Sequence, residues 1–176
     1  MQRVAEGDMQ AFRRLVIAHQ PRLLRFARRM LPTDRTLAED VVQETFVRLW
    51  RVRSRYHATG QLGCFLLQIV HNLCLDAVRD APAILSLETA KDLPAAGGSL
   101  HEQMEARSLA DAVRHAVQEL PELQRSVFVL SHYEGLTYAE IAQMLECPVG
   151  TVASRKRLAV ETLRRRLGSW NEGEER

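Results

Sequence analysis

Apolar side chains recur at spacings of three and four residues along most of the chain, which is the pattern of amphipathic helices. Alternating β-branched runs and Asn-Gly turns, which would indicate strands and hairpins, are missing. We therefore expect an all-α protein. The pattern predicts helices over about 8–19, 21–30, 37–52, 64–79, 102–119, 121–133, 138–145 and 148–167.

Residues suited to helix starts precede several of these segments. Asp8 is placed to cap the first helix, and Pro21, which is tolerated at a first helical position, to open the second. Thr36 and Glu39 have capping-box spacing at the start of the third. These signals predict four helices in the first half of the chain.

The second half carries sharper local signals. Thr137 and Glu140 form a second capping box, and Leu136 stands opposite Ile141 at the spacing of a hydrophobic staple. Pro148 then opens a longer helix after a turn of a few residues. Two helices joined by a tight turn are typical of a helix-turn-helix motif.

The last helix has one apolar side and one polar side. Periodicity places Ser154 and Arg157 on the polar side, in the half of such a helix that enters the major groove, where Arg can bond guanine. Lys156 lies within the apolar stripe, so its stem can pack while its ammonium reaches toward a phosphate or a partner. The stripe itself consists of Val149, Val152, Ala159, Val160, Leu163 and Leu167.

Positive charge is concentrated on this helix. Residues 154–166 hold six basic groups and one acidic group, which suits DNA phosphates. A simple solvated basic helix is the alternative, but the capping box, the staple and the short turn together favour a DNA-binding element.

Charge and composition divide the 176-residue chain, whose net charge is only +2. Residues 1–79 hold 13 basic and 7 acidic groups, 80–106 hold 1 and 5, and 107–176 hold 10 of each. The acidic stretch also contains prolines and glycines, so it predicts a linker between two small domains. We expect a domain over 1–80, a linker over 81–101, a domain over 102–170 and a tail over 171–176.

Other classes of protein are disfavoured. No stretch approaches the roughly 20 uncharged apolar residues of a membrane span, and the start has no export signal, so we expect a cytoplasmic protein without membrane insertion. Cys64, His71 and Cys74 share one side of a helix and could bind zinc or sense redox state, but small buried thiols explain them more simply. No catalytic or phosphate-binding motif is present, so we expect neither an enzyme nor a cofactor.

Several motifs resemble those of bacterial RNA polymerase sigma factors, in particular the extracytoplasmic-function (ECF) group. The helix-turn-helix segments LTYAEIA at 136–142 and CPVGTV at 147–152 resemble the second conserved domain of that family. AEDVVQETFVRLW at 38–50 is similar to its core-binding helix, and HNLCLDAVR at 71–79 resembles the end of its promoter-melting helix. Two motifs in the family's order are more specific than a helix-turn-helix alone.

The resemblance covers about 8–80 and 102–167 and implies a site for each partner. On the core-binding helix, one exposed acidic and polar face would meet the clamp helices of the polymerase largest subunit: Asp40, Gln43, Glu44 and Val47. The second domain would meet the polymerase flap, and an anti-sigma factor is expected by analogy. Without the resemblance, Asp40 and Glu44 would be read as solvating the helix.

Two sets of residues would read the promoter. The minus-thirty-five element would meet Thr151, Ser154, Arg155, Lys156 and Arg157 of the last helix. The minus-ten element offers unstacked bases that aromatic, polar and cationic groups can hold: Arg53, Arg55, Tyr56, His57, Thr59 and Gln61. Gly63 and Phe65 stand where the group often has Arg and Trp.

The leading interpretation is a promoter-specificity subunit of RNA polymerase. The alternatives are a stand-alone helix-turn-helix regulator that binds operator DNA without polymerase, and an interaction protein that binds no DNA. The acidic linker, which resemblance places toward the polymerase active centre, is equally explained as a flexible tether.

Overall fold

The computed structural model describes residues 1–31, 35–56, 62–80 and 100–174. Within these ranges it contains helices and no strand, so the predicted all-α class is confirmed. The chain divides into two compact units, Met1–Glu88 and Thr89–Arg176, and the division falls inside the predicted linker. Each unit has its own core.

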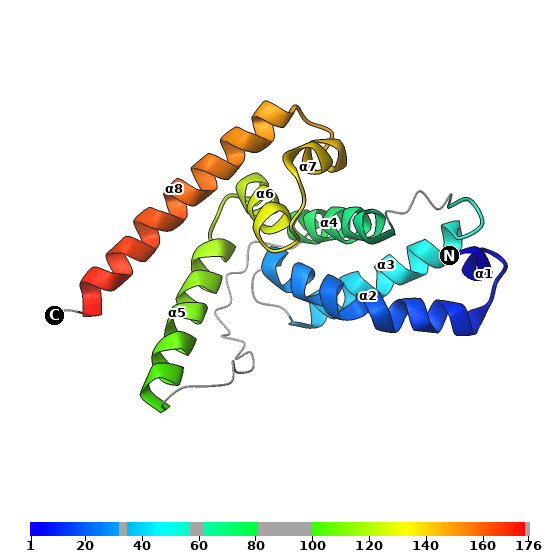
Figure 1. The fold of residues 1–176 in the computed structure, drawn as a ribbon, viewed down its shortest axis with the longest axis horizontal. Helices are drawn as coiled ribbons and strands as arrows, with labels where there is room; N and C mark the ends of the chain where they lie inside the picture. Colours follow the sequence, from blue (N-terminus) through cyan, green and yellow to red (C-terminus); the bar gives the residue numbers. More distant parts are fainter. Residues whose placement is uncertain (32–34, 57–61, 81–99, 175–176) are drawn as a thin grey trace. The chain divides into compact units, whose positions relative to one another are not determined.

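The first unit consists of one short helix and three long helices that pack on one another (Figure 1): α1 Gln2–Ala5, α2 Met9–Met30, α3 Arg35–Val52 and α4 Leu62–Asp80. Its core contains Phe26 of α2, Leu49 of α3 and Leu66 and Val70 of α4, all fully buried. Burying a side chain of this size contributes roughly 1.5–3 kcal/mol, which is why α2, α3 and α4 form one body.

Helix α2 corrects the prediction of two separate helices. Asp8 caps it as expected, because its Oδ1 accepts hydrogen bonds from the amides of Gln10 and Ala11 at 2.8 and 2.9 Å. Pro21, however, lies inside the helix. Proline removes the amide that would bond the carbonyl of Ile17, and its ring crowds that carbonyl. The Ile17 side chain is 62% exposed, so this turn faces water, which can solvate the carbonyl.

The capping box expected at Thr36 is also wrong. Helix α3 begins at Arg35, so Thr36 lies inside the helix and not at its N-cap. Glu39 instead forms a 3.7 Å ion pair with Arg28 of α2. The spacing of a capping box occurs inside helices as well, and here a neighbouring helix supplies the partner.

The second unit contains the remaining four described helices: α5 Leu100–Gln118, α6 Glu122–His132, α7 Tyr138–Met144 and α8 Val149–Glu174. Its core brings together Val127 and Leu130 of α6, Ile141 of α7 and Val152 and Ala159 of α8, all fully buried. Helix α8 therefore packs on both α6 and α7, and α5 lies against α8 as well.

Two expectations about α8 are wrong. The helix continues past the predicted end at 167 into the predicted tail, since a single glycine such as Gly168 costs only about 1 kcal/mol inside a helix. Val149, expected in the apolar stripe, is 49% exposed. It is the first residue of α8, and periodicity gives the side of the helix on which a residue lies but not whether a neighbour covers it.

Helix α4 is long and apolar enough, by length and composition alone, to cross a membrane, which the sequence analysis did not anticipate. Core helices of globular proteins also have this property. In the described structure α4 buries Leu66, Leu67, Val70 and Leu73 in a helical unit where it packs on α2 and α3. This packing accounts for its apolar character.

Candidate functional site

The helix-turn-helix of the second unit is held by bonds between residues close in sequence. The amide of Thr137 donates to Glu140 at 2.8 Å and the amide of Glu140 donates to the Thr137 hydroxyl at 3.3 Å, which confirms the capping box. The Thr137 hydroxyl also bonds this carboxylate, and these bonds lower the pKa of Glu140. After α7, Glu146 adopts a left-handed φ of 50° and the Cys147 amide donates to the Ala142 carbonyl at 3.0 Å. The turn thus ends α7 and lets α8 begin at Val149 and pack back on α7.

The two predicted base-reading side chains are exposed on α8. The Ser154 hydroxyl donates to the Thr151 carbonyl at 3.0 Å, and Thr151 itself is half-buried. Arg157 forms a 2.8 Å ion pair with Glu161 one turn later. Both arrangements are local and exposed, so DNA can compete for the hydroxyl and the guanidinium at small cost.

The other cations of α8 have different surroundings. Arg155 is half-buried, with Nη1 3.8 Å from the Cys147 sulfur. The Lys156 Nζ lies 4.3 Å from the centre of the Phe128 ring, and burial lowers the pKa of this ammonium. The stem of Lys156 packs as predicted, but the ammonium rests on an aromatic face of α6 and does not extend outward, because the ring attracts it.

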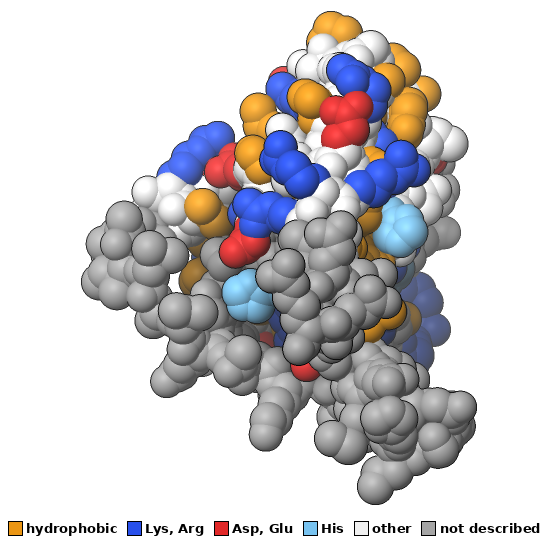
Figure 2. Space-filling model, turned by 90° about the vertical axis from the view of Figure 1, so that its left-hand side faces the viewer, with side chains coloured by type: hydrophobic (Ala, Val, Ile, Leu, Met, Phe, Trp, Pro, Cys, Tyr) orange, Lys and Arg blue, Asp and Glu red, His pale blue; other side chains and the backbone are white. Residues whose placement is uncertain are grey.

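Basic side chains near the end of this stretch add exposed charge. Arg166 pairs with Glu119, which follows α5, while Arg164 and Arg165 are exposed. Figure 2 shows Lys and Arg side chains on one face of the molecule, with Asp and Glu side chains between several of them. On α8 the exposed basic side chains outnumber the exposed acidic ones, which suits a polyanion.

On α3 of the first unit, the predicted protein-binding side chains lie outward. Asp40 and Gln43 are exposed, Val47 is 42% exposed, and Glu44 pairs with Arg48 at 3.1 Å. The opposite side of the helix is buried. The face therefore combines charge, an amide and an exposed apolar group, which is the composition of a protein interface.

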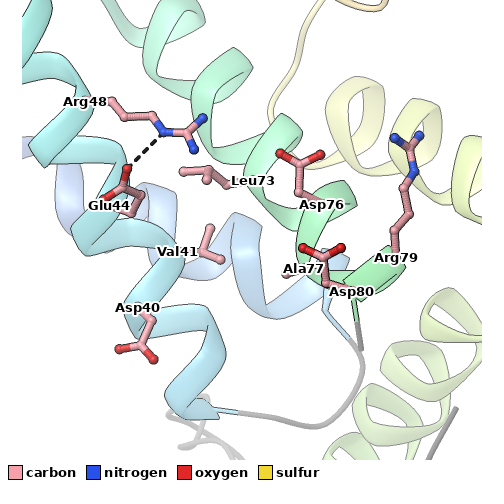
Figure 3. Close-up of a pocket in the computed structure, with 9 residues that line it drawn as sticks. All are labelled: Asp40, Val41, Glu44, Arg48, Leu73, Asp76, Ala77, Arg79 and Asp80. Carbon is pink, nitrogen blue, oxygen red and sulfur yellow. Dashed lines mark hydrogen bonds and ion pairs between the residues drawn. The ribbon is translucent and has the colours of Figure 1, made fainter. Parts of the chain in front are cut away.

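Helices α3 and α4 enclose a groove of about 440 Å³, which Asp40 and Glu44 of this face help to line (Figure 3). Val41, Leu73 and Ala77 supply its apolar part, while Arg79 points away from α3. The acidic side chains of the groove come from both helices: Asp40, Glu44, Asp76 and Asp80. The sequence predicted only the α3 half of the groove, because no local pattern links residues 40–48 to residues 73–80.

The segment predicted to bind the minus-ten element is partly described. His57, Thr59 and Gln61 lie outside the described residues. Tyr56 is half-buried, its ring 4.9 Å from that of Phe65, and burial raises the pKa of its hydroxyl. Arg55 is exposed. One aromatic pair and one free-standing cation therefore border this segment.

Arg53 does not extend outward as a DNA-binding cation would. Its Nη1 donates to the Trp50 carbonyl at 2.7 Å, and the guanidinium carbon lies 4.1 Å from the centre of the Trp50 ring. Trp50 in turn lies 4.9 Å from the Phe12 ring of α2. In this structure Arg53 caps α3 and packs on an aromatic cluster, a role that the sequence did not indicate.

Cys64, His71 and Cys74 all belong to α4, and Cys74 and His71 are buried. The His71 Nδ1 lies 3.3 Å from the Asn72 side-chain oxygen. Among the described residues, no group of three or more His, Cys, Asp or Glu side chains is arranged to hold a metal ion.

Comparison with known proteins bears on both units. The family description of sigma-70 region 2 matches residues 15–82, and that of sigma-70 region 4 matches residues 110–163. The ECF RNA polymerase sigma-E factor of Escherichia coli K12 is 30% identical over 166 residues, which span 88% of this chain and 85% of that protein. The chain belongs to the ECF sigma factors. The RNA polymerase sigma-H factor of Pseudomonas aeruginosa is 29% identical over 170 residues, with the same coverage.

Solved structures agree with this ECF sigma factor in fold. CnrH, solved with the cytosolic domain of CnrY, is 25% identical with a TM-score of 0.68, over 96% of this chain and 94% of that one. The sigma factor RpoE of Bartonella quintana, solved with the anti-sigma factor NepR, has a TM-score of 0.71 at 24% identity, over 91% and 98%.

Membership in the family establishes the general activity. The protein is a promoter-specific transcription initiation factor that directs core RNA polymerase, and sigma factors are initiation factors, not enzymes. A stand-alone helix-turn-helix regulator is not favoured, because the match to region 2 covers the first unit as well.

Proposed function

We propose that the first unit of this sigma factor binds the clamp helices of the polymerase largest subunit through the groove between α3 and α4. Asp40 and Glu44 line its α3 side, and Leu73, Asp76 and Asp80 line its α4 side. Gln43 and Val47 are exposed on α3 and extend the surface beyond the groove. Acidic groups around an apolar floor match a basic, partly apolar partner surface. The polymerase flap is the expected partner of the second unit.

The second unit reads the minus-thirty-five duplex through α8. Ser154 and Arg157 face base edges, while Thr151 and Arg155 lie at the start of the helix, where the phosphate backbone passes. Lys156 supports α8 through Phe128 and reaches a phosphate only by leaving that ring. The exposed cations of α8 supply the salt-dependent part of the affinity.

The minus-ten element binds beside the start of α4. Tyr56 with Phe65 offers an aromatic surface for an unstacked base, and Arg55 offers a charge for the backbone. His57, Thr59 and Gln61 supply donors and acceptors for base edges, and Arg53 joins them only by leaving Trp50.

An anti-sigma factor that covers the groove of the first unit would keep this protein from polymerase. RpoE of Bartonella quintana was solved with the anti-sigma factor NepR, and CnrH was solved with the cytosolic domain of CnrY. An exposed groove with an apolar floor suits a regulatory helix of basic character. We expect the protein to act in the bacterial cytoplasm, without a cofactor and without catalysis.

A single observation carries this proposal: one chain combines two surfaces. The second unit has a helix-turn-helix with a basic α8, and the first unit, which matches sigma-70 region 2, has an acidic groove between α3 and α4. The test is transcription in vitro with purified core polymerase on a library of genomic promoters. Adding the protein should start RNA synthesis at a limited set of sites. If core polymerase with the protein starts at the same sites as core polymerase alone, the proposal fails.

A further inference from the structure

Arg22 of α2 lies against the first turn of α4. These two helices pack on each other within the first unit (Figure 1). Gly63 is the second residue of α4, and a Cβ placed on it would stand 3.1 Å from Nη1 of Arg22. A side chain at position 63 would crowd this guanidinium, which would have to shift by a few tenths of an ångström, so the small residue allows the close approach.

The neighbours of Arg22 place this charge at the edge of the minus-ten segment. The residues predicted to bind the minus-ten element end at Gln61 in the sequence, and α4 begins with the next residue, Leu62. His19 lies one turn before Arg22, and its pKa is lowered by burial and by the charge of Arg22. Arg22 is half-buried and lies against the first turn of α4, directly after the point where the predicted minus-ten segment joins that helix.

We propose that Arg22 contacts the sugar–phosphate backbone of the melted minus-ten strand, and that Gly63 leaves the space for it. This inference rests on the proposal that residues 53–61 bind the minus-ten element. A guanidinium held in place loses less side-chain freedom on binding than a free one, so it suits a fixed phosphate contact. No sequence pattern indicated Arg22, because its position in α2 is far along the chain from the segment that it would assist.

The test measures binding of a fluorescent single-stranded minus-ten oligonucleotide to the reconstituted holoenzyme over a range of salt concentrations. Neutralising one phosphate contact lowers the slope of log affinity against log salt by about 0.7, or about fourfold in affinity at 0.15 M salt. Arg22→Gln should show this change. The matched control Arg13→Gln removes an exposed arginine about half a turn around the same helix and should leave the slope unchanged.

Two further variants separate a DNA contact from helix packing. Arg22→Lys keeps the charge and should keep the slope. In the double variant Arg22→Gln with Gly63→Lys, an ammonium carried by α4 replaces the lost charge at nearly the same place and should restore the slope. Equal slopes for Arg22→Gln and Arg13→Gln would overturn the inference, as would loss of affinity in Arg22→Lys equal to that in Arg22→Gln. If the unaltered holoenzyme does not bind the oligonucleotide at all, the proposed function of the segment fails instead.

Discussion

The helix-turn-helix of the second unit and the groove of the first unit are built differently. The hydrogen bonds and ion pairs of α7, the turn and residues 151–161 of α8 join residues at most eight positions apart, such as Thr137 with Glu140 and Arg157 with Glu161. The groove joins Asp40 and Glu44 of α3 to Asp76 of α4, more than thirty residues later. Local chemistry therefore shapes the surface that we propose reads DNA, whereas packing between helices shapes the surface that we propose binds polymerase.

The largest effect should come from the groove. Asp40→Ala with Gln43→Ala removes a charged and a neutral hydrogen-bonding group, and should weaken core polymerase binding by about 3 kcal/mol, roughly 150-fold. The measurement is a titration of labelled sigma factor with core polymerase. The matched control is Glu6→Ala with Gln20→Ala. It removes one exposed carboxylate just before α2 and one exposed amide within α2. Equal affinity of the two double variants would reject the α3 face as the contact.

The next effect should come from the exposed face of α8. Arg157→Ala removes the predicted bidentate contact to a base and should cost about 2 kcal/mol of specific affinity for the minus-thirty-five duplex. The measurement is the affinity of the holoenzyme for minus-thirty-five duplexes that are each altered at a single base pair. Arg114→Ala, which breaks an ion pair on α5, is the control. If every altered duplex loses affinity equally in Arg157→Ala, Arg157 contacts phosphate and does not read a base.

A smaller effect is expected at the capping box. Thr137→Ala should lower the free energy of unfolding by about 1 kcal/mol at neutral pH, since the N-cap hydroxyl is lost. The lowered pKa of Glu140 gives the pH dependence: the stabilisation is present above pH 4.5 and is lost as pH falls through the lowered value. Urea unfolding at several pH values measures it. A difference between wild type and variant that does not shrink in acid would contradict this account.

The smallest effect is expected at Lys156. Lys156→Leu removes the cation–π contact with Phe128, which stabilises the fold, but it also removes the cost of burying the ammonium. The free energy of unfolding should therefore stay equal or rise, by less than about 1 kcal/mol. Burial lowers the pKa of Lys156 below 10.5 in the folded chain. Between that lowered value and 10.5, the unfolded chain binds more protons than the folded chain. The free energy of unfolding of the wild type should therefore rise with pH in this range. The variant should lack this rise.

Urea unfolding between neutral and alkaline pH checks the last prediction. Lys91→Leu replaces the only other lysine of the chain and is the control. A large loss of stability in Lys156→Leu would mean that the ammonium on Phe128 is a major support of α8.

The sequence predicted most of the helices and the outward residues of α3 and α8. Periodicity placed Asp40, Ser154 and Arg157 correctly on exposed faces, because helical geometry alone decides which residues share a side. It failed at Pro21, where exposure lets the helix continue, and at Val149, where no neighbour covers an apolar side chain. It also failed at Thr36, whose helix starts earlier.

The candidate site was predicted in part for the same reason. The capping box at Thr137 and the reading face of α8 depend on neighbours along one helix, and both are described by spacing alone. The second wall of the groove, the stacking of Arg53 on Trp50 and the approach of Arg22 to Gly63 have no such signature. Each depends on which helices lie side by side.

By itself, the sequence determined the helical class, the division into two units, the helix-turn-helix and the family, since these follow from periodicity, charge and short motifs. Tertiary structure decided which charges are available to partners: Arg157 stays on an exposed face, Lys156 rests on Phe128, and Arg53 is drawn onto Trp50. A cation takes the nearest favourable partner in space, and that partner can belong to a distant part of the chain.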